Sequence, residues 1–314
     1  MKKKLIAATI IIVLIAACFI PVTLQQSLTI KSTFFNTYEQ FARANNWKKW
    51  RSDLRDTWMS DSSKITTQAT GNTFSIACKE LTLQVTNIDG YSFNVDEKNA
   101  DGELFYNYTV TPKKEQNQAQ VVVSEKKSFI KYLSGLFSGN SLPETHLGDI
   151  KRFMENPDLY YGFNIRKVHV TDTNIVVLTK TVPAKSQFDE AGQLLSALKQ
   201  YAASKQLRQV QPLIAQFLPG RNDSVRLKIG LPVDKKIQTQ PPFLFMTMPP
   251  GGYFYTTTYT GKLSNKIKAY SALYQYFRDR AMQTPILPFE TYLDNKLPIA
   301  DTSQVHLRLN FSTF

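Results

Sequence analysis

Glu290 is the side chain of this sequence best placed to do chemistry. It lies in Ile286-Leu-Pro-Phe-Glu-Thr-Tyr292, a stretch that is otherwise apolar and aromatic. Apolar surroundings disfavour the charged form of a carboxylate, and a bound cation offsets that cost. Glu290 therefore indicates either a site for a cationic ligand or a group for acid–base work. The alternative is an exposed glutamate beside ordinary core tyrosines.

Aromatic residues gather around this glutamate in the sequence pattern. Alternation along a strand places Tyr253, Tyr255 and Tyr259 on one face. Helical spacing puts Tyr270 and Tyr274 on the same face as Phe277. Aromatic faces attract cations, so these rings would add to a carboxylate site. The predicted ligand-binding residues are Glu290, Tyr292, Tyr255, Tyr270 and Tyr274.

Other chemistries find little support. The two cysteines, Cys18 and Cys78, cannot form a disulfide framework. The histidines, His146, His169 and His306, lie far apart, and neither HExxH nor CxxC occurs, so we expect no metal site and no cofactor. No Gly-rich phosphate loop, GxSxG elbow or paired-carboxylate motif is present. Cys78 is more typical of a small core residue than of a nucleophile.

Length and composition predict two packed domains. The chain has 314 residues, of which 42% are hydrophobic and 20% charged, so it can bury a core. Its net charge of +13 is spread along the sequence. Because no basic recognition helix is visible, we interpret this charge as a solvated or membrane-facing surface and expect no nucleic-acid partner.

The first residues predict a membrane segment. Lys2-Lys3-Lys4 precede an apolar run from Leu5 to Ile20, which residues 21–24 extend. Such a run is long enough to span a bilayer, with the lysines cytoplasmic and the later domains outside. We therefore expect a single-pass anchor over residues 1–24, in contact with the membrane through residues 5–24. Two alternatives remain: a lipoprotein modified at Cys18, or a cleaved signal peptide.

Residues 25–160 predict a first, β-rich domain. A strand (25–32) and a short amphipathic helix (34–44) precede a series of short β-type runs separated by Gly71-Asn72, Asp89-Gly90 and Asp101-Gly102. Helical patterns return at 129–137 and 143–154. This order, with the pattern Asn46-Trp-Lys-Lys-Trp50, resembles the START-like (SRPBCC, polyketide-cyclase-like) helix-grip family. The resemblance implies an antiparallel sheet wrapped around a helix, with a lipophilic cavity; the alternative is that the aromatic residues fill a core.

Residues 163–314 contain an internal repeat. Ser196-Ala-Leu-Lys-Gln-Tyr201 recurs as Ser271-Ala-Leu-Tyr-Gln-Tyr276, an offset of 75 that also relates Phe217 to Tyr292 and 175–180 to 250–255. Val225–Ile229 and Val305–Leu309 match at an offset of 80. The offset of 75 places Ala215 at the position of Glu290, so the fold itself does not require a carboxylate there. We expect two strand–helix–strand units that share one sheet, with a groove between their helices at a pseudo-twofold axis.

This second half resembles the GyrI-like family, the effector-binding domain of AraC-type and multidrug-sensing regulators. The matching residues are Leu231-Pro-Val-Asp234, Met248-Pro-Pro-Gly-Gly-Tyr253, Gly261, Ala269-Tyr270, Phe277, Phe289-Glu-Thr-Tyr292 and Val305–Phe311. The sequence differs from the family at Phe254 and Lys262-Leu263. The resemblance implies that the glutamate of the Glu-x-Tyr motif, here Glu290, points into a central pocket.

The complete chain is therefore expected to be α+β: a transmembrane helix, a START-like domain and a duplicated GyrI-like domain. The function that follows is binding of a small amphipathic or cationic molecule at the membrane, without a DNA-binding domain. The alternative is a GyrI-like hydrolase of strained electrophiles in which Glu290 is the acid–base group. The sequence offers no second catalytic carboxylate, which favours binding.

Overall fold

The computed structural model describes residues 21–79, 81–100, 102–115, 117–129, 144–171, 173–248 and 251–313. The chain divides into two compact units, Met1–Asn156 and Pro157–Phe314. Each unit is built around one antiparallel sheet with helices, so the fold is mixed α+β.

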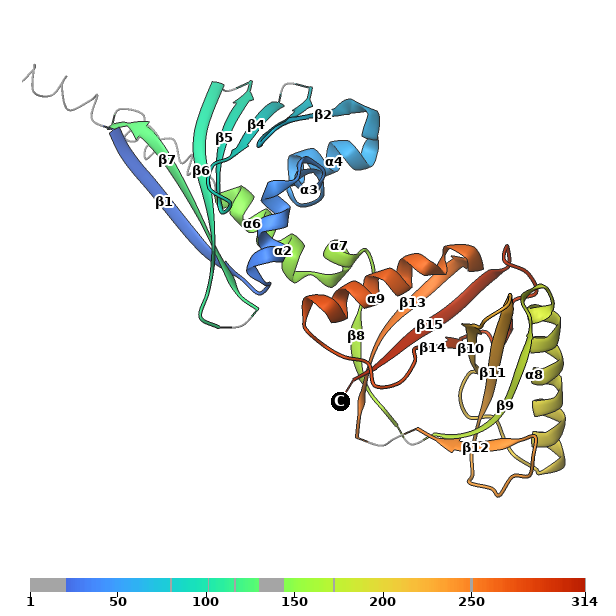
Figure 1. The fold of residues 1–314 in the computed structure, drawn as a ribbon. Helices are drawn as coiled ribbons and strands as arrows, with labels where there is room; N and C mark the ends of the chain where they lie inside the picture. The colour runs from blue at the N-terminus through green and yellow to red at the C-terminus, as the bar shows by residue number, and fades with distance from the viewer. Residues whose placement is uncertain are drawn as a thin grey trace, which may run out of the picture. The chain divides into compact units, whose positions relative to one another are not determined.

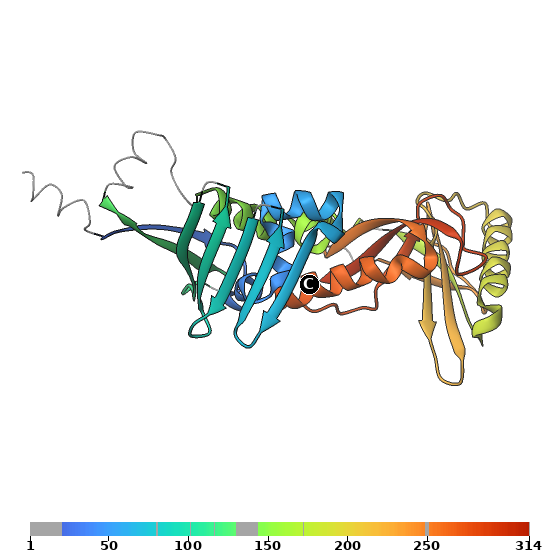
Figure 2. The same cartoon turned by 90° about the horizontal axis from the view of Figure 1, so that it is seen from above.

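The first unit contains one antiparallel sheet, in which the first strand pairs with the last strand and the other strands follow in sequence order. Its strands are β1 (Pro21–Ile30), β2 (Ile65–Thr70), β3 (Thr73–Cys78), β4 (Leu81–Asn87), β5 (Ser92–Asn99), β6 (Gly102–Pro112) and β7 (Ala119–Ser128). They lie in the order β1-β7-β6-β5-β4-β3-β2, and all pairs are antiparallel. Figures 1 and 2 show the helices of this unit on one face of the sheet. The tight turns at Gly71 and Gly90 have positive φ, as the sequence pattern requires.

Strand β1 begins earlier than the sequence pattern predicts. Pro21 pairs with Ser128 and Leu24 with Glu125, so residues 21–24 belong to the sheet and the expected span of 5–24 is wrong at its end. Pro21 cannot continue a helix, and beyond it Val22 and Leu24 alternate with polar residues at the strand period. The rest of the predicted anchor, with Cys18, lies outside the described residues. Within the described residues, no helix is long and apolar enough to cross a membrane.

Helices of the first unit pack an aromatic core onto this sheet. They are α2 (Phe34–Ala42), α3 (Ala44–Trp50), α4 (Ser52–Ser60) and α6 (Glu144–Glu155). The Thr33 side chain caps the N-terminus of α2 by accepting a hydrogen bond from the backbone N–H of Asn36. Trp47 and Trp50 are fully buried, 4.8 Å apart between ring centroids, and each donates its indole N–H to a carbonyl of α2. These rings therefore fill the space between helices and sheet, as the core alternative expects.

The second unit has a sheet of pseudo-twofold symmetry. Its strands are β8 (Arg166–His169), β9 (Asn174–Pro183), β10 (Ile214–Pro219), β11 (Ser224–Val233), β12 (Leu244–Thr247), β13 (Tyr253–Lys262), β14 (Phe289–Tyr292) and β15 (Gln304–Thr313). Their order, β12-β9-β11-β10-β14-β15-β13-β8, reads as two equivalent halves that meet between β10 and β14. A short helix, α7 (Pro157–Tyr161), precedes the sheet, and α8 (Gln187–Ser204) and α9 (Ile267–Asp279) are the equivalent long helices (Figure 1).

The repeat is real, but its offset changes along the chain. Strands β9 and β13 begin at Asn174 and Tyr253, an offset of 79, so the equivalent of 175–180 is 254–259 and the expected 250–255 is wrong. Helix α8 has 18 residues and α9 has 13, and this difference lowers the offset to 75 at the helix ends. The loop before β15 is longer than the loop before β11, and it restores an offset of 80.

The two faces of this sheet differ in character. Side chains from one face of β9, β11, β13 and β15 pack with α8 and α9 into one apolar core. On α9 the buried stripe is Ala269, Ala272, Leu273 and Phe277. Tyr274, which helical spacing puts on the same face as Phe277, is 52% exposed. Among the described residues, the opposite face carries a small apolar cluster of Val170, Phe254 and Phe289.

Candidate functional site

Glu290 lies buried at the centre of the second unit, with both carboxylate oxygens occupied. Only 2% of the residue is exposed. Lys266 Nζ lies 2.5 Å from Oε1, and the Tyr270 hydroxyl donates to the same oxygen at 2.9 Å. The Tyr292 hydroxyl donates to Oε2 at 2.6 Å. We call this group, Glu290 with Lys266, Tyr270 and Tyr292, the Glu290 cluster.

The fold brings this cluster to the pseudo-twofold axis. In the pairing of β10 with β14, Ala215 lies directly opposite Glu290, the two positions that the repeat relates. Phe217, the counterpart of Tyr292, has its ring 5.7 Å from Lys266 Nζ. Glu290 and Tyr292 point to the helix side because residues two apart on a strand share a face. One half of the repeat therefore supplies the carboxylate and the other supplies small and aromatic neighbours.

The hydroxyl groups around Glu290 are held as donors. Burial, and then the nearby Glu290 charge, raise the pKa of Tyr270 and Tyr292 well above the usual value for a phenol. Both tyrosines therefore stay protonated through neutral pH and donate to the carboxylate. Glu290 thus accepts hydrogen bonds from two groups that stay donors and also pairs with an ammonium group.

Lys266 is the residue of the cluster that the sequence pattern does not single out. It ends the short 3₁₀ turn Leu263–Lys266 and immediately precedes α9. Its side chain is 23% exposed, so the ammonium group has access to solvent while it pairs with a buried partner. The sequence offers three lysines in this segment, Lys262, Lys266 and Lys268, and no periodicity distinguishes them. The cation expected beside Glu290 is thus supplied by the chain itself.

The other two predicted ligand-binding tyrosines lie in different surroundings. Tyr255 packs with Tyr276 and Phe277, at ring separations of 5.3 and 5.6 Å. Tyr274 is half exposed and packs edge-on against Phe311 at 4.8 Å. The structure brings Tyr270 and Tyr292 onto Glu290, places Tyr274 beside Tyr270 and groups Tyr255 with other aromatic rings.

The first unit holds a separate buried polar cluster. Arg51, 1% exposed, pairs with Glu97 at 3.0 Å and with Asp53 at 2.9 Å. The Tyr106 hydroxyl donates to Glu97 at 2.6 Å and accepts from Arg51. Burial works to raise the pKa of Glu97, but the charge and hydrogen bond of Arg51 outweigh it, and the pKa is lowered.

His146, on α6, faces this network, and its lowered pKa should make the stability of the first unit depend on pH. Burial, and then the charge of Arg51, lower the pKa of His146. Its Nδ1 has no hydrogen-bond partner among the described residues. The unfolded chain therefore binds a proton at a higher pH than the folded chain does. Stability is complete above the ordinary histidine pKa of about 6.5 and is lost as pH falls through the lowered value.

The wild-type chain is expected to lose more stability between pH 7 and pH 5 than the variant His146→Phe does. Urea unfolding followed by tryptophan fluorescence measures this, because all three tryptophans lie in the first unit. His169→Gln, at an exposed position of β8, is the control and should keep the wild-type pH dependence. An equal loss in His146→Phe and wild type would show that His146 does not carry the effect.

The remaining candidates take no part in either cluster. Cys78 is a buried free thiol in β3, 6% exposed. His169 packs edge-on against Tyr253, whose ring also lies under the Lys167 ammonium group. Among the described residues, no group of three or more His, Cys, Asp and Glu side chains is arranged to hold a metal ion.

No family model and no curated protein matches the chain. Several solved structures are similar to part of it. The C-terminal domain of EcmrR has 13% identity, covers 48% of this chain and 98% of its own, and has a TM-score of 0.37. The SAV2435 protein bound to tetraphenylphosphonium has 9% identity, coverage of 48% and 94%, and a TM-score of 0.34.

A hydrolase from Listeria innocua is similar at 10% identity, with coverage of 47% and 90% and a TM-score of 0.34. Similarity at this level does not by itself assign a function to the chain.

Proposed function

We propose that the second unit is a GyrI-like binding module for a small lipophilic cation, and that Glu290 is its anionic anchor. The observation that carries this proposal is the Glu290 cluster: a buried carboxylate at the twofold axis, which the repeat does not require and which pairs with a lysine. A ligand cation would take the position of the Lys266 ammonium group. The partly exposed Lys266 and the half-exposed Tyr274 lie where a ligand would enter the site.

The two tyrosines of the cluster fit this exchange. Tyr270 and Tyr292 hold the carboxylate in place whether its partner is Lys266 or a ligand. Phe217 and Tyr270 would offer ring faces to a cation that replaces the lysine. The cost of exchange is the loss of one ion pair, while the released lysine gains hydration at the surface. The module is therefore closed without a ligand and opens by movement of a single side chain.

Tetraphenylphosphonium, a lipophilic cation, is a suitable probe. The full chain should bind it, and Glu290→Gln should weaken binding by roughly 10-fold or more because a desolvated charge partner is lost. Asp301→Asn makes the same chemical change at an exposed loop position and should leave the affinity unchanged. Isothermal titration calorimetry gives the dissociation constants. Equal affinity in Glu290→Gln and wild type would refute the proposal.

The hydrolase of strained electrophiles is the second candidate. Glu290 beside two tyrosine hydroxyls is suitable equipment for acid–base catalysis. In the ligand-free arrangement, however, both carboxylate oxygens are already engaged, which favours binding over activation of water. Turnover of an electrophilic substrate that vanishes in Glu290→Gln would decide for the enzyme.

We further propose that the first unit is a START-like domain and that the chain is held at a membrane, with both units outside the cytoplasm. The pairing of β1 with β7 and the helices on one sheet face support the first point. The apolar run 5–20 after three lysines supports the second, now ending before Pro21. Lipidation at Cys18 is the alternative form of attachment. With either form, detergent should extract the chain from the membrane and salt should not.

A further inference from the structure

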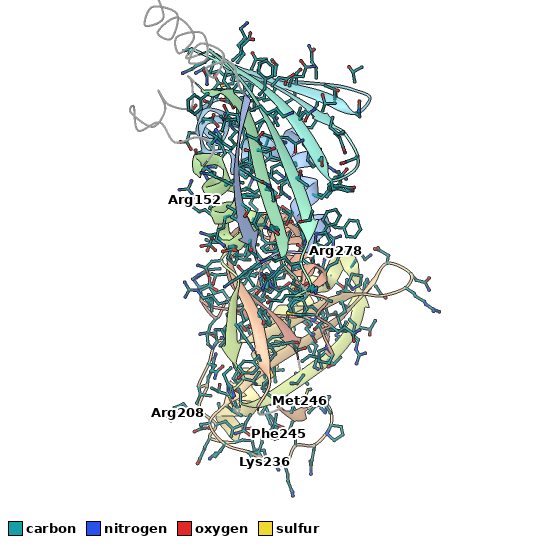
Figure 3. All side chains as sticks on the ribbon, turned by 90° about the vertical axis from the view of Figure 1, so that its left-hand side faces the viewer. Arg152, Arg208, Lys236, Phe245, Met246 and Arg278 are labelled. Carbon is teal, nitrogen blue, oxygen red and sulfur yellow. The ribbon has the colours of Figure 1, made fainter. Side chains whose placement is uncertain are left out.

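The face of the second sheet that carries no helix is hollowed in two adjoining places. One hollow, the apolar lobe, has a volume of about 270 Å³ and is lined by side chains such as Met246, Leu287 and Val177. The other, the polar lobe, has a volume of about 310 Å³ and is lined by Arg308, Asn310, Gln211 and several threonines. Ile214, Met248 and Phe289 line both, so the lobes are continuous. Met246 lies on β12, at one end of this unit (Figure 3).

Each lobe contains one Lys or Arg side chain at an equivalent position of the repeat, and His169 also lines the polar lobe. Lys228 on β11 lines the apolar lobe and Arg308 on β15 lines the polar lobe, and the offset of 80 relates them. Three strand spacings separate their strands, which is about 14 Å. Neither lobe is lined by an aspartate or glutamate of the described chain. The open face therefore collects positive charge, whereas the helix face holds the carboxylate of Glu290.

Arg308 is a half-buried cation that pairs with no carboxylate of the described residues. Its Nε is buried and has no hydrogen-bond partner among the described residues. Burial alone lowers the pKa of Arg308, and burial with the Arg226 charge lowers that of Lys228. A guanidinium group taken from water without a partner costs free energy, and a carboxylate or sulfonate that accepts two of its hydrogen bonds repays it.

We propose that this open face is a second binding site, specific for a small amphipathic anion, with its acidic head on Arg308 and its apolar body in the apolar lobe. Arg308 and the amide of Gln211 supply donors for the head. The body lies over Ile214 and Phe289 and reaches Met246 and Leu287, of which the last is 61% exposed in the ligand-free chain. This site is on the opposite side of the sheet from the Glu290 cluster and prefers the opposite charge.

Three probes with one apolar body test the charge preference in the full chain. Isothermal titration calorimetry should show binding of 2-naphthoate and at least 10-fold weaker binding of neutral 2-naphthol. Any binding of 2-naphthylmethylammonium should be the same in Arg308→Met and wild type, because this face does not take a cation. Arg308→Met should weaken 2-naphthoate by about 10-fold or more, as loss of a buried charge partner does. Arg226→Met is the control. It also removes an arginine from this face of the sheet, on β11, but Arg226 lines neither lobe, so the affinity should stay unchanged.

A second variant tests the same site if Arg308→Met folds poorly. Ile214→Phe narrows the passage shared by the two lobes without altering charge, and it should also weaken 2-naphthoate. Unchanged affinity for 2-naphthoate in a folded Arg308→Met, or in Ile214→Phe, would overturn the proposal. So would equal weakening by Arg226→Met, which would indicate only general attraction to a basic surface. The result does not depend on whether tetraphenylphosphonium binds.

Discussion

Replacing Arg51 by methionine is expected to lower the free energy of unfolding of the first unit by about 3–5 kcal/mol. Arg51 is 1% exposed, and its partner Glu97 is 5% exposed, so the substitution leaves a buried carboxylate without its cation. The Tyr106 hydroxyl still donates to Glu97, but one neutral donor does not replace an ion pair. Asp53, at 41% exposed, can turn to water and adds little to the loss.

Urea unfolding followed by tryptophan fluorescence measures this change, since Trp47 and Trp50 pack in the core of the same unit. Arg43→Met is the matched control, because Arg43 is 68% exposed and pairs with a glutamate at the surface. It should change stability by less than about 1 kcal/mol. The double variant Arg51→Met with Glu97→Leu should be more stable than Arg51→Met alone, because it removes the unpaired charge. A neutral effect of Arg51→Met would contradict the account of this network.

The second large effect is expected at Lys266. Lys266→Met removes the ammonium group that pairs with buried Glu290 and should destabilise the ligand-free second unit by about 2–4 kcal/mol. The loss should lie toward the lower end for a buried pair, because the Lys266 side chain is 23% exposed and two tyrosines still donate to the carboxylate.

Hydrogen exchange read by mass spectrometry on peptides from β14 and β15 follows this unit alone. Protection in these peptides should fall in Lys266→Met. Lys268→Met makes the same change at an exposed position of α9 and should keep the wild-type protection. Equal protection in the two variants would show that the Lys266–Glu290 pair contributes little.

Much of the fold follows from local signals in the sequence. Turn residues such as Asp89-Gly90 separate β4 from β5, and buried and exposed residues alternate along both strands as the sequence pattern predicts. The repeated Ser-Ala-Leu-x-Gln-Tyr segment predicts the twofold arrangement of the second sheet. Glu290 could be singled out because its counterpart is Ala215, and the structure places the two opposite each other.

What the sequence could not give depends on contacts between distant residues. Lys266 joins Glu290 only through the way α9 crosses the sheet, and nothing in its local pattern sets it apart from Lys268. The offset of the repeat changes within the helices because α8 is five residues longer than α9. Hydrophobic periodicity does not show where a helix ends, so it does not predict this difference. The sequence pattern assigns the apolar residues at the start of β1 to a membrane run because composition in a short window does not separate a strand from a helix.

The affinity of tetraphenylphosphonium for Lys266→Met, compared with wild type, tests the central claim most directly. If Lys266 occupies the place of a ligand cation, its removal frees Glu290 and should tighten binding by about 10-fold, equivalent to about 1.4 kcal/mol. Lys268→Met should bind as wild type does. Calorimetry on the full chain would then rank the affinities as Lys266→Met, wild type and Glu290→Gln, from tightest to weakest. Unchanged or weaker binding in Lys266→Met would contradict the exchange of lysine for ligand.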